Sequence, residues 1–175
     1  MTKTFKLHLL LFFVFFSTAH AADPIAKIGW EKSRDLETPK TVEQKAGSQK
    51  PLPLLTIDSP KVTEQNHAVG GEIRYSDFAG TGFVEMWTHC ENGAHYFSRT
   101  RGEAGPMAKL SGTSEWRPFL LPFFGEANTV LSKLQINLML PGGGTVEFRN
   151  VALYQLPRDG VWRTSKRRVA CRNGK

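Results

Sequence analysis

Residues 131–156 read LSKLQINLMLPGGGTVEFRNVALYQL, and this stretch decides the fold because its side chains alternate between apolar and polar. Successive side chains of a β-strand point to opposite faces, so a period of two indicates a strand with one buried face. The apolar side of the first half consists of Leu134, Ile136, Leu138 and Leu140. Its polar side contains Gln135 and Asn137. The glycines of PGGG (141–144) tolerate positive φ and predict a turn between two antiparallel strands.

The second half of the stretch shows the same alternation with one interruption. In 144–149, Val146 and Phe148 lie on one side, opposite Glu147 and Arg149. Beyond this point the pattern slips by one position, because residues 151–154 are all apolar or aromatic. An extra residue in one strand of a pair produces such a slip. The sequence therefore predicts a β-bulge near Asn150.

A similar strand-like sequence pattern extends back to residue 51. Short runs rich in β-branched and aromatic residues are separated by Gly, Pro, Asn and Ser, which is typical of consecutive antiparallel strands. The predicted strands are 52–57, 62–65, 68–76, 82–90, 94–100, 116–123, 131–140 and 144–156. The Asn-Gly pair in ENG (91–93) favours a tight hairpin. The sequence thus predicts one all-β domain over 51–157, a two-sheet antiparallel β-sandwich.

The stretch GTSEWRPFLLPFFG (112–125) has two interpretations, a recognition surface or a part of the core. Its large apolar residues alternate, and burying each of them contributes about 1.5–3 kcal/mol; they are Phe119, Leu121 and Phe123. Pro118 and Pro122 cannot donate to a ladder, which favours an edge strand. We therefore expect core and edge here, and only Trp116 remains open for recognition.

Residues 1–21 have the features of a secretory signal peptide. Lys3 and Lys6 give a positive start, and LHLLLFFVFF (7–16) is apolar. AHA (19–21) then places small residues before the expected cleavage point. The apolar run is shorter than the about 20 residues needed to cross a bilayer. We expect cleavage and a secreted or periplasmic product that does not span the membrane, with an uncleaved anchor as the alternative.

Charge and composition differ between the two ends of the remaining chain. The net charge is +7, and residues 158–175 hold seven Lys or Arg and one Asp. This basic C-terminal tail is either a solvated extension or a binding segment for anionic lipid or an acidic envelope polymer. Nucleic acid is not expected as a partner of an exported protein. Residues 22–50 mix charges with few apolar side chains, which predicts a flexible, mostly disordered leader.

Two cysteines, Cys90 and Cys171, are the only ones in the chain. Export places them where disulfides form. A bridge between them would close a long loop, contribute roughly 4 kcal/mol by the chain-entropy model and attach the basic tail to the domain. The sequence alone does not show whether the two residues approach each other.

Three segments give the domain a family resemblance: GEIRYSDFAGTGFVEMW (71–87), GTSEWRPFLLPF (112–123) and the stretch 131–156. Together they resemble the galactose-binding-like jelly roll, as in carbohydrate-binding modules of the four/nine type, over residues 60–156. The resemblance implies a jelly-roll sandwich and carbohydrate binding. Family members often carry an acidic residue, associated with a structural calcium, at the step into the last strand. Here EFRNVAL (147–153) has Arg149 and Asn150 at that step, which argues against calcium, and we expect no cofactor.

Polar and aromatic side chains opposite the predicted core form the candidate binding site. If neighbouring strands pair as inferred, nine of them share one sheet face: Glu72, Arg74, Glu85, Trp87, His89, Gln135, Asn137, Glu147 and Arg149. A sugar site combines a flat aromatic ring with carboxylates, amides and guanidinium groups that bond the hydroxyls. Trp87 is the stacking candidate. The alternative is an ordinary solvent-facing sheet, with Trp87 covered by a loop or by the leader.

Metal binding and catalysis have weaker support. HCENGAH (89–95) contains His89, Cys90 and His95, but adjacent residues of a strand face opposite sides and a closed zinc site needs a fourth ligand. We expect no metal. Ser98 lacks the G-x-S-x-G context of a hydrolase nucleophile, although a Ser–His–Asp triad can assemble in space.

The sequence therefore supports three hypotheses about function. The first is an exported, non-catalytic binding module that recognises a carbohydrate or an envelope polymer on one sheet face. The second is a structural or protein-interaction module of the cell envelope with no small-molecule ligand. The third is a small hydrolase on a jelly-roll scaffold, with Ser98 as its candidate nucleophile.

Overall fold

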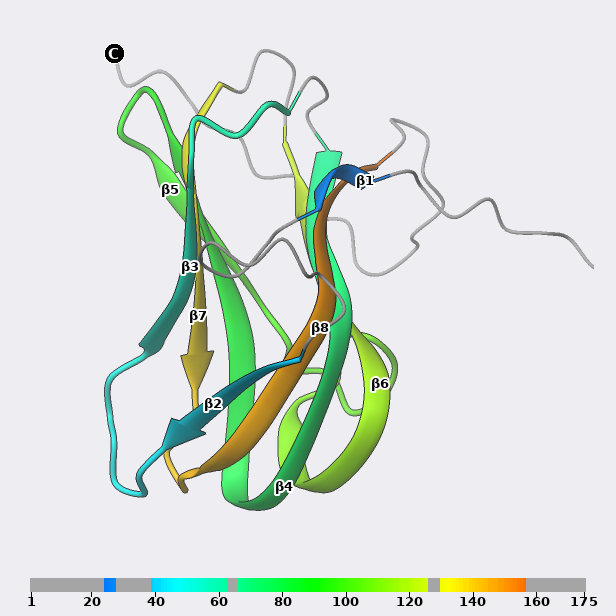
Figure 1. The fold of residues 1–175 in the computed structure, drawn as a ribbon. Coiled ribbons are helices and arrows are strands. Elements are labelled where there is room, and N and C mark those ends of the chain that lie inside the picture. Colours follow the sequence, from blue (N-terminus) through cyan, green and yellow to red (C-terminus); the bar gives the residue numbers. More distant parts are fainter. Residues whose placement is uncertain (1–23, 28–38, 63–65, 126–129, 157–175) are drawn as a thin grey trace, which may run out of the picture.

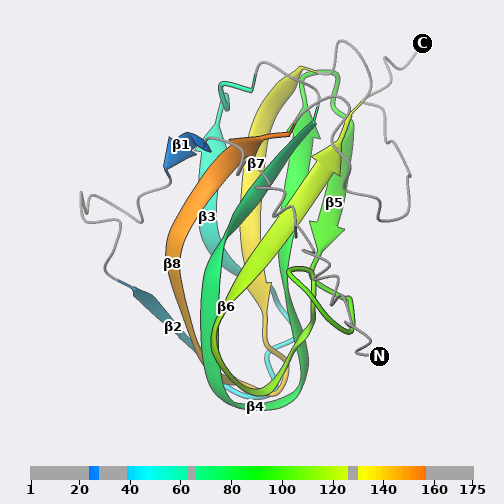
Figure 2. The same cartoon turned by 90° about the vertical axis from the view of Figure 1, so that its right-hand side faces the viewer.

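One strand of 25 residues, β4 (Asn66–Cys90), organises the fold. Its first half pairs with β6 (Leu110–Phe124) and β8 (Gly144–Gln155), and its second half pairs with β5 (His95–Arg99) and β7 (Leu131–Met139). Between the halves the chain bends, with positive φ values at Asp77 and Gly80. Figure 2 shows β4 running between the other strands, so that it contributes to both layers of the molecule.

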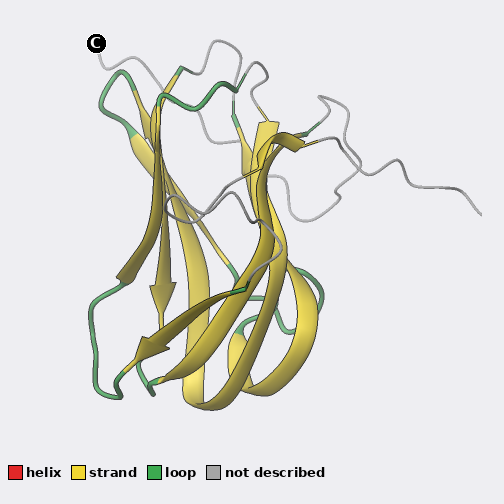
Figure 3. Ribbon diagram, in the orientation of Figure 1, coloured by secondary structure: helices red, strands yellow, loops and turns green. Residues whose placement is uncertain are grey.

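The computed structural model describes residues 24–27, 39–62, 66–125 and 130–156. Three further strands complete the pairing: β1 (Pro24–Lys27) and β2 (Lys40–Gln44) lie on β8, and β3 (Leu52–Asp58) lies on β7. We call β1, β2, β8, the first half of β4 and β6 the β8 layer. The β7 layer contains β3, β7, the second half of β4 and β5. All these pairs are antiparallel, and Figures 1 and 3 show the two layers facing each other.

The all-β antiparallel class is thus confirmed, in the form of a sheet that curls through β4 into two layers. Within the described ranges, no helix has the length and apolar character that a membrane crossing requires. The signal peptide expected over residues 1–21 and the basic tail over 158–175 lie outside these ranges.

The core lies between the layers and consists of the side chains that alternation predicts. Leu134, Ile136, Leu138, Leu140, Val146, Phe148, Phe119, Leu121 and Phe123 are each at most 5% exposed. The rings of Phe119 and Phe148 meet edge to face, with centroids 5.8 Å apart. The stretch GTSEWRPFLLPFFG (112–125) therefore contributes core side chains, as expected. It also forms an edge strand, because within the described residues β6 pairs only with β4.

The predicted bulge is present in β8. Gly70 pairs with Ala152 and Glu72 with Arg149, so two steps along β4 match three along β8. Asn150 has a φ of 52°, in the left-handed region that asparagine tolerates. A Cβ on Gly71 would lie 3.0 Å from the carbonyl oxygen of Arg149, so a glycine faces the bulge.

Three predictions about strands differ from the structure. Residues 68–76 and 82–90, predicted as separate strands, belong to the continuous β4, because the glycines and Asp77 between them bend the strand without ending it. The strand predicted at 62–65 is not seen: Val62 lies outside every strand, and 63–65 lie outside the described residues. Residues 22–50 are predicted as a mostly disordered leader, but β1 and β2 fall inside them and pair with β8.

The glycine-rich turn between β7 and β8 packs against the bend of β4. Gly143 has a φ of 70°, and its N–H donates to the carbonyl oxygen of Leu140 at 3.0 Å. A Cβ on Gly142 would fall 1.5 Å from the carbonyl oxygen of Ala79. Only glycine fits at position 142, because the two backbones touch there.

Candidate binding site

The outer side of the β7 layer carries a continuous patch of rings and polar groups, which we call the Trp87 face. Its members on β4, β5 and β7 are Phe83, Glu85, Trp87, His89, His95, Phe97, Arg99, Lys133, Gln135 and Asn137. Cross-strand pairing aligns them in rows: Glu85 with Arg99 and Asn137, Trp87 with Phe97 and Gln135, and His89 with His95 and Lys133. Five of the nine predicted site residues therefore lie together.

Glu85 fixes the geometry of the Trp87 face. Its side chain is 2% exposed, and its carboxylate accepts hydrogen bonds from Trp87 Nε1 at 2.9 Å, Asn137 Nδ2 at 3.0 Å and Arg99 Nε at 2.8 Å. Burial alone would raise the pKa of Glu85, but these three hydrogen bonds and the charge of Arg99 outweigh it and lower that pKa below its ordinary value. One buried anion thus holds side chains from three strands in fixed orientations.

Aromatic rings form the exposed part of the face. The Trp87 ring lies 5.3 Å from Phe97 and 5.7 Å from His95, measured between centroids. Phe97 is 56% exposed, while Trp87 is half-buried. Because Glu85 engages the indole N–H, Trp87 can offer a ligand the surface of its ring but not its donor.

His89 lies at one end of the face and stays neutral at neutral pH. Burial lowers its pKa, the positive charge of Lys133 lowers it further, and a hydrogen bond with Gln135 partly offsets both effects. Its Nε2 atom is buried without a hydrogen-bond partner among the residues that the structure describes. The His95 ring lies 6.1 Å away across the strand pair.

The four other predicted residues lie on the outer side of the β8 layer, so the prediction of one shared face is wrong. Glu72 and Arg74 precede the bend of β4, whereas Glu85 and Trp87 follow it, and the bend carries the strand from one layer to the other. The alternation of side chains along β4 does not reveal this change of layer.

Around Trp116 these four residues form a second arrangement, the Trp116 cluster: Glu72, Arg74, Trp116, Glu147 and Arg149. The guanidinium carbon of Arg149 lies 4.2 Å from the indole centroid and that of Arg74 lies 4.9 Å from it. Each arginine also binds a carboxylate on the neighbouring strand: Arg74 binds Glu147 at 2.6 Å and Arg149 binds Glu72 at 2.9 Å.

These ion pairs account for the electrostatics of the cluster. A hydrogen bond from Arg74 lowers the pKa of Glu147. Bonds from Arg149 and Asn150 lower the pKa of Glu72. Since both carboxylates are matched by neighbouring donors, the cluster satisfies its own charges, and both guanidinium groups lie over the Trp116 ring.

Sequence reasoning missed several members of the Trp87 face on and beside β5. Phe97 and Arg99 alternate with inward-facing residues, as Glu85 and Trp87 do on β4, and the run AHYFSRT (94–100) contains that signal. Arg101 extends the patch beyond β5, since its guanidinium carbon lies 5.0 Å from the centroid of the Phe83 ring.

The hairpin HCENGAH separates the groups weighed for metal binding. His89 and His95 are on the outer side, whereas Cys90 is 4% exposed and is disulfide-bonded. Its expected partner, Cys171, lies outside the described residues. Within those residues no group of three or more His, Cys, Asp or Glu side chains is placed to hold a metal ion.

Ser98 does not join the histidines either. It pairs with Met86, a core residue, and therefore lies on the opposite side of β5 from Phe97 and His95.

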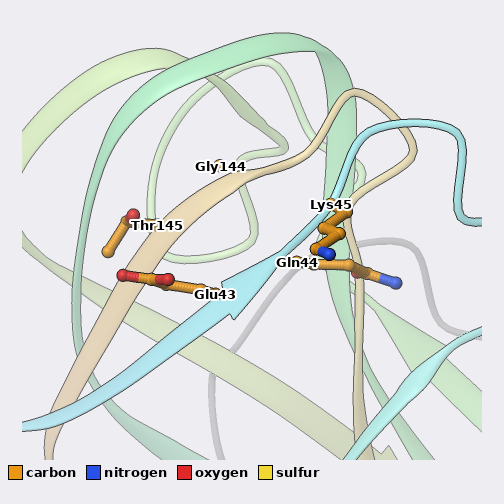
Figure 4. A pocket seen from close by; sticks show the side chains of 5 residues that line it. All are labelled: Glu43, Gln44, Lys45, Gly144 and Thr145. Atoms are coloured by element: carbon orange, nitrogen blue, oxygen red, sulfur yellow. The ribbon is translucent and has the colours of Figure 1, made fainter.

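A cavity of about 360 Å³ lies beside the end of β2. Figure 4 shows its lining, formed by Glu43, Gln44, Lys45, Gly144 and Thr145. Backbone groups occupy the side-chain amide of Gln44, because its oxygen accepts a hydrogen bond from Leu140 N and its nitrogen donates one to the Lys50 carbonyl. None of the nine predicted site residues lines this cavity, and it has no aromatic ring.

Comparisons with known proteins do not identify a family or a ligand for this site. No family model matches the chain, and no curated protein matches it. Among solved structures, that of the infectious bursal disease virus Gt strain is similar with a TM-score of 0.42 and 15% identity, covering 75% of this chain and 37% of that one. The VP2 subviral particle of the same virus gives a TM-score of 0.35 and 14% identity, covering 78% and 43%.

This chain thus spans less than half the length of those viral proteins. Similarity at this level carries no argument about what the chain binds.

Proposed function

We propose that the chain is an exported, non-catalytic binding module that recognises a carbohydrate or an envelope polymer on the Trp87 face. The observation that carries the proposal is the buried carboxylate of Glu85, which fixes Trp87, Arg99 and Asn137 beside the exposed ring of Phe97. Saccharide sites need an aromatic platform with oriented polar groups around it. A platform that is rigid before binding loses less side-chain entropy when the ligand arrives.

The surrounding features support the same proposal. The signal sequence expected at residues 1–21 would bring the module to the periplasm or the cell exterior, where glycans are available. The resemblance to carbohydrate-binding jelly rolls agrees with the two-layered strand arrangement. The amide of Gln135, next to Trp87 across the strand pair, adds donor and acceptor groups for sugar hydroxyls.

Binding is tested by titrating the mature chain with a panel of soluble glycans while recording tryptophan fluorescence. The chain has four tryptophans, so the Trp87→Phe variant identifies which part of the signal belongs to Trp87. We expect a saturable change that Trp87→Phe lacks and a loss of affinity of about tenfold or more in Trp87→Ala. Trp116→Ala is the matched control, because it removes an indole from the other layer and should leave affinity unchanged.

The competing function is a protein-interaction module, and one observation favours it. Phe97 is exposed on β5, which pairs only with β4 among the described strands, so both a ring and a strand edge face outward. A glycan panel without any response, together with recovery of an envelope protein that Phe97→Ala fails to recover, would replace the carbohydrate proposal with this one.

A further inference from the structure

The Trp87 face continues at one end into a row of alternating rings and guanidinium groups. Arg99 and Arg101 each place the guanidinium carbon 5.0 Å from the Phe83 ring, on which both therefore stack. Arg99 also lies 4.1 Å from the Phe97 ring. Cation–π contact holds a guanidinium by its flat surface and leaves its N–H groups, which lie in the plane, free to bind other groups.

Arg101 is unlike the other arginines of the described chain. Arg74, Arg99 and Arg149 donate to carboxylates, and Arg117 donates to backbone carbonyls. Arg101 is exposed, and within the described residues it contacts the Phe83 ring. It is therefore an oriented cation with no carboxylate partner among the residues that the structure describes.

Charge is distributed unevenly over the face. The anion on it, Glu85, is buried and already accepts three hydrogen bonds. At the far end Lys133 is the cross-strand backbone neighbour of Asp58 of β3, but among the described residues the two side chains form no ion pair. Positive charge without an ion pair among the described residues thus lies at both ends of the face, on Arg101 at one end and on Lys133 at the other.

The dimensions of the face suit an extended ligand. From Phe83 to His89, β4 advances six residues, which at a rise of about 3.3 Å per residue gives a length of about 20 Å. Rings and polar groups occur along the whole of this length. Such a surface can contact several consecutive units of a polymer.

We propose that the ligand of the Trp87 face is a linear acidic glycan whose sugar units carry carboxylates, with Trp87 and Phe97 stacking on sugar rings and Arg101 binding a carboxylate. This inference rests on the proposed function. It adds that the ligand is negatively charged and that Arg101 binds this charge. A planar guanidinium matches a carboxylate with two parallel hydrogen bonds. Arg99, held by Glu85 through Nε, lies over the same Phe83 ring as Arg101.

The test compares a charged and an uncharged cellulose derivative and adds a second acidic polymer. Carboxymethyl cellulose and hydroxyethyl cellulose share a backbone, and polygalacturonate supplies carboxylates on every sugar. We expect the mature chain to bind polygalacturonate and carboxymethyl cellulose in affinity electrophoresis or calorimetry, to ignore hydroxyethyl cellulose, and to bind more weakly as salt rises.

Variants assign the effect to the face. Arg101→Gln should weaken binding about tenfold, since a charge-assisted hydrogen bond is lost, and Arg101→Lys should retain part of the affinity because it keeps the charge. Lys45→Gln, beside the cavity at β2, removes one positive charge elsewhere and should bind as the wild type does. The basic tail is present in every variant, so its contribution to polyanion binding cancels.

Five outcomes would overturn the inference, and they separate it from the proposed function. Equal binding of the two celluloses, or wild-type affinity in Arg101→Gln, removes the acidic ligand but leaves carbohydrate binding in place. Binding of dextran sulfate without polygalacturonate replaces the carboxylate by a sulfate. Tighter binding of a single-stranded oligothymidylate makes nucleic acid the ligand. Failure to bind any glycan refutes both proposals.

Discussion

Glu85 is the residue on which the Trp87 face depends. It is almost fully buried and yet charged, and its carboxylate links β4 to β5 through Arg99 and to β7 through Asn137. A buried ion pair adds little net stability by itself, but removing one partner leaves the other charge without compensation. Substitution at this position should therefore affect both stability and the orientation of the rings.

We predict that Glu85→Gln lowers the free energy of unfolding by about 3 kcal/mol, because Arg99 loses its buried counter-charge. Urea denaturation followed by circular dichroism measures the change. Glu103→Gln is the matched control: Glu103 also pairs with a cation, Lys109, but its side chain is 82% exposed, so we expect a loss below about 1 kcal/mol. Equal losses in the two variants would contradict the role given to Glu85.

At the scale of elements, contacts between backbones constrain the sequence most strongly. The turn at Gly142 touches the bend of β4, and the bulge at Asn150 faces Gly71. Both contacts join segments that lie far apart in the chain. The curl of the sheet therefore depends on glycines as well as on the apolar core.

Replacing Gly142 by alanine should destabilise the protein by about 2 kcal/mol or more, because the new methyl group would overlap the Ala79 carbonyl and force the turn away from β4. Gly93→Asn is the control, since a Cβ at this exposed turn has nothing within 4 Å and asparagine tolerates its φ of 83°. Thermal melts of both variants measure the difference. A Gly142→Ala protein as stable as the wild type would show that the turn is not in close contact.

The strands that alternation predicts best are those with one buried and one exposed face. Residues 131–140 follow this rule, as do 144–149 before the bulge, and the structure places β7 and β8 there. β2 was not predictable, because its run KTVEQ (40–44) has one core side chain, Val42, and pairs with β8 alone. The joining of 68–76 with 82–90 was also hidden, since glycines and Asp77 mark both turns and bends.

The candidate site was predictable where side chains alternate between two faces of a strand. It was not predictable across the bend of β4. Alternation correctly groups Glu85, Trp87 and His89, and pairing with β7 adds Gln135 and Asn137. Nothing local in the sequence shows that Glu72 and Arg74, on the same strand, belong to the other layer. That information comes from the bend, which only the folded chain reveals.

For the whole molecule, several depressed pKa values act in the same direction. Glu72, Glu85 and Glu147 have lowered pKa values in the fold, each with hydrogen bonds from arginine. A carboxyl with a lowered pKa adds stability above its unfolded pKa, and this stability is lost as the pH falls through the folded value. The pKa of His89 is also lowered in the fold. On acidification the unfolded chain therefore binds a proton at this histidine before the folded chain does, and this favours unfolding.

We therefore predict that the free energy of unfolding falls on acidification in two windows, one beginning near the ordinary histidine value of 6.5 and one near the ordinary carboxyl value of 4.5. Urea titrations at a series of pH values measure the curve. His89→Asn should flatten the upper window and leave the lower one. Stability that rises between pH 6.5 and pH 5 would contradict the assignment.

The passage of β4 through both layers has a further consequence for how such a domain can diversify. A recombination event that removed, duplicated or exchanged one layer would cut the central strand of the other layer as well. New specificity must therefore come from side chains on the outer surfaces and from loops. The Trp87 face and the Trp116 cluster are consequently inherited together, because each is built on one half of the same continuous strand.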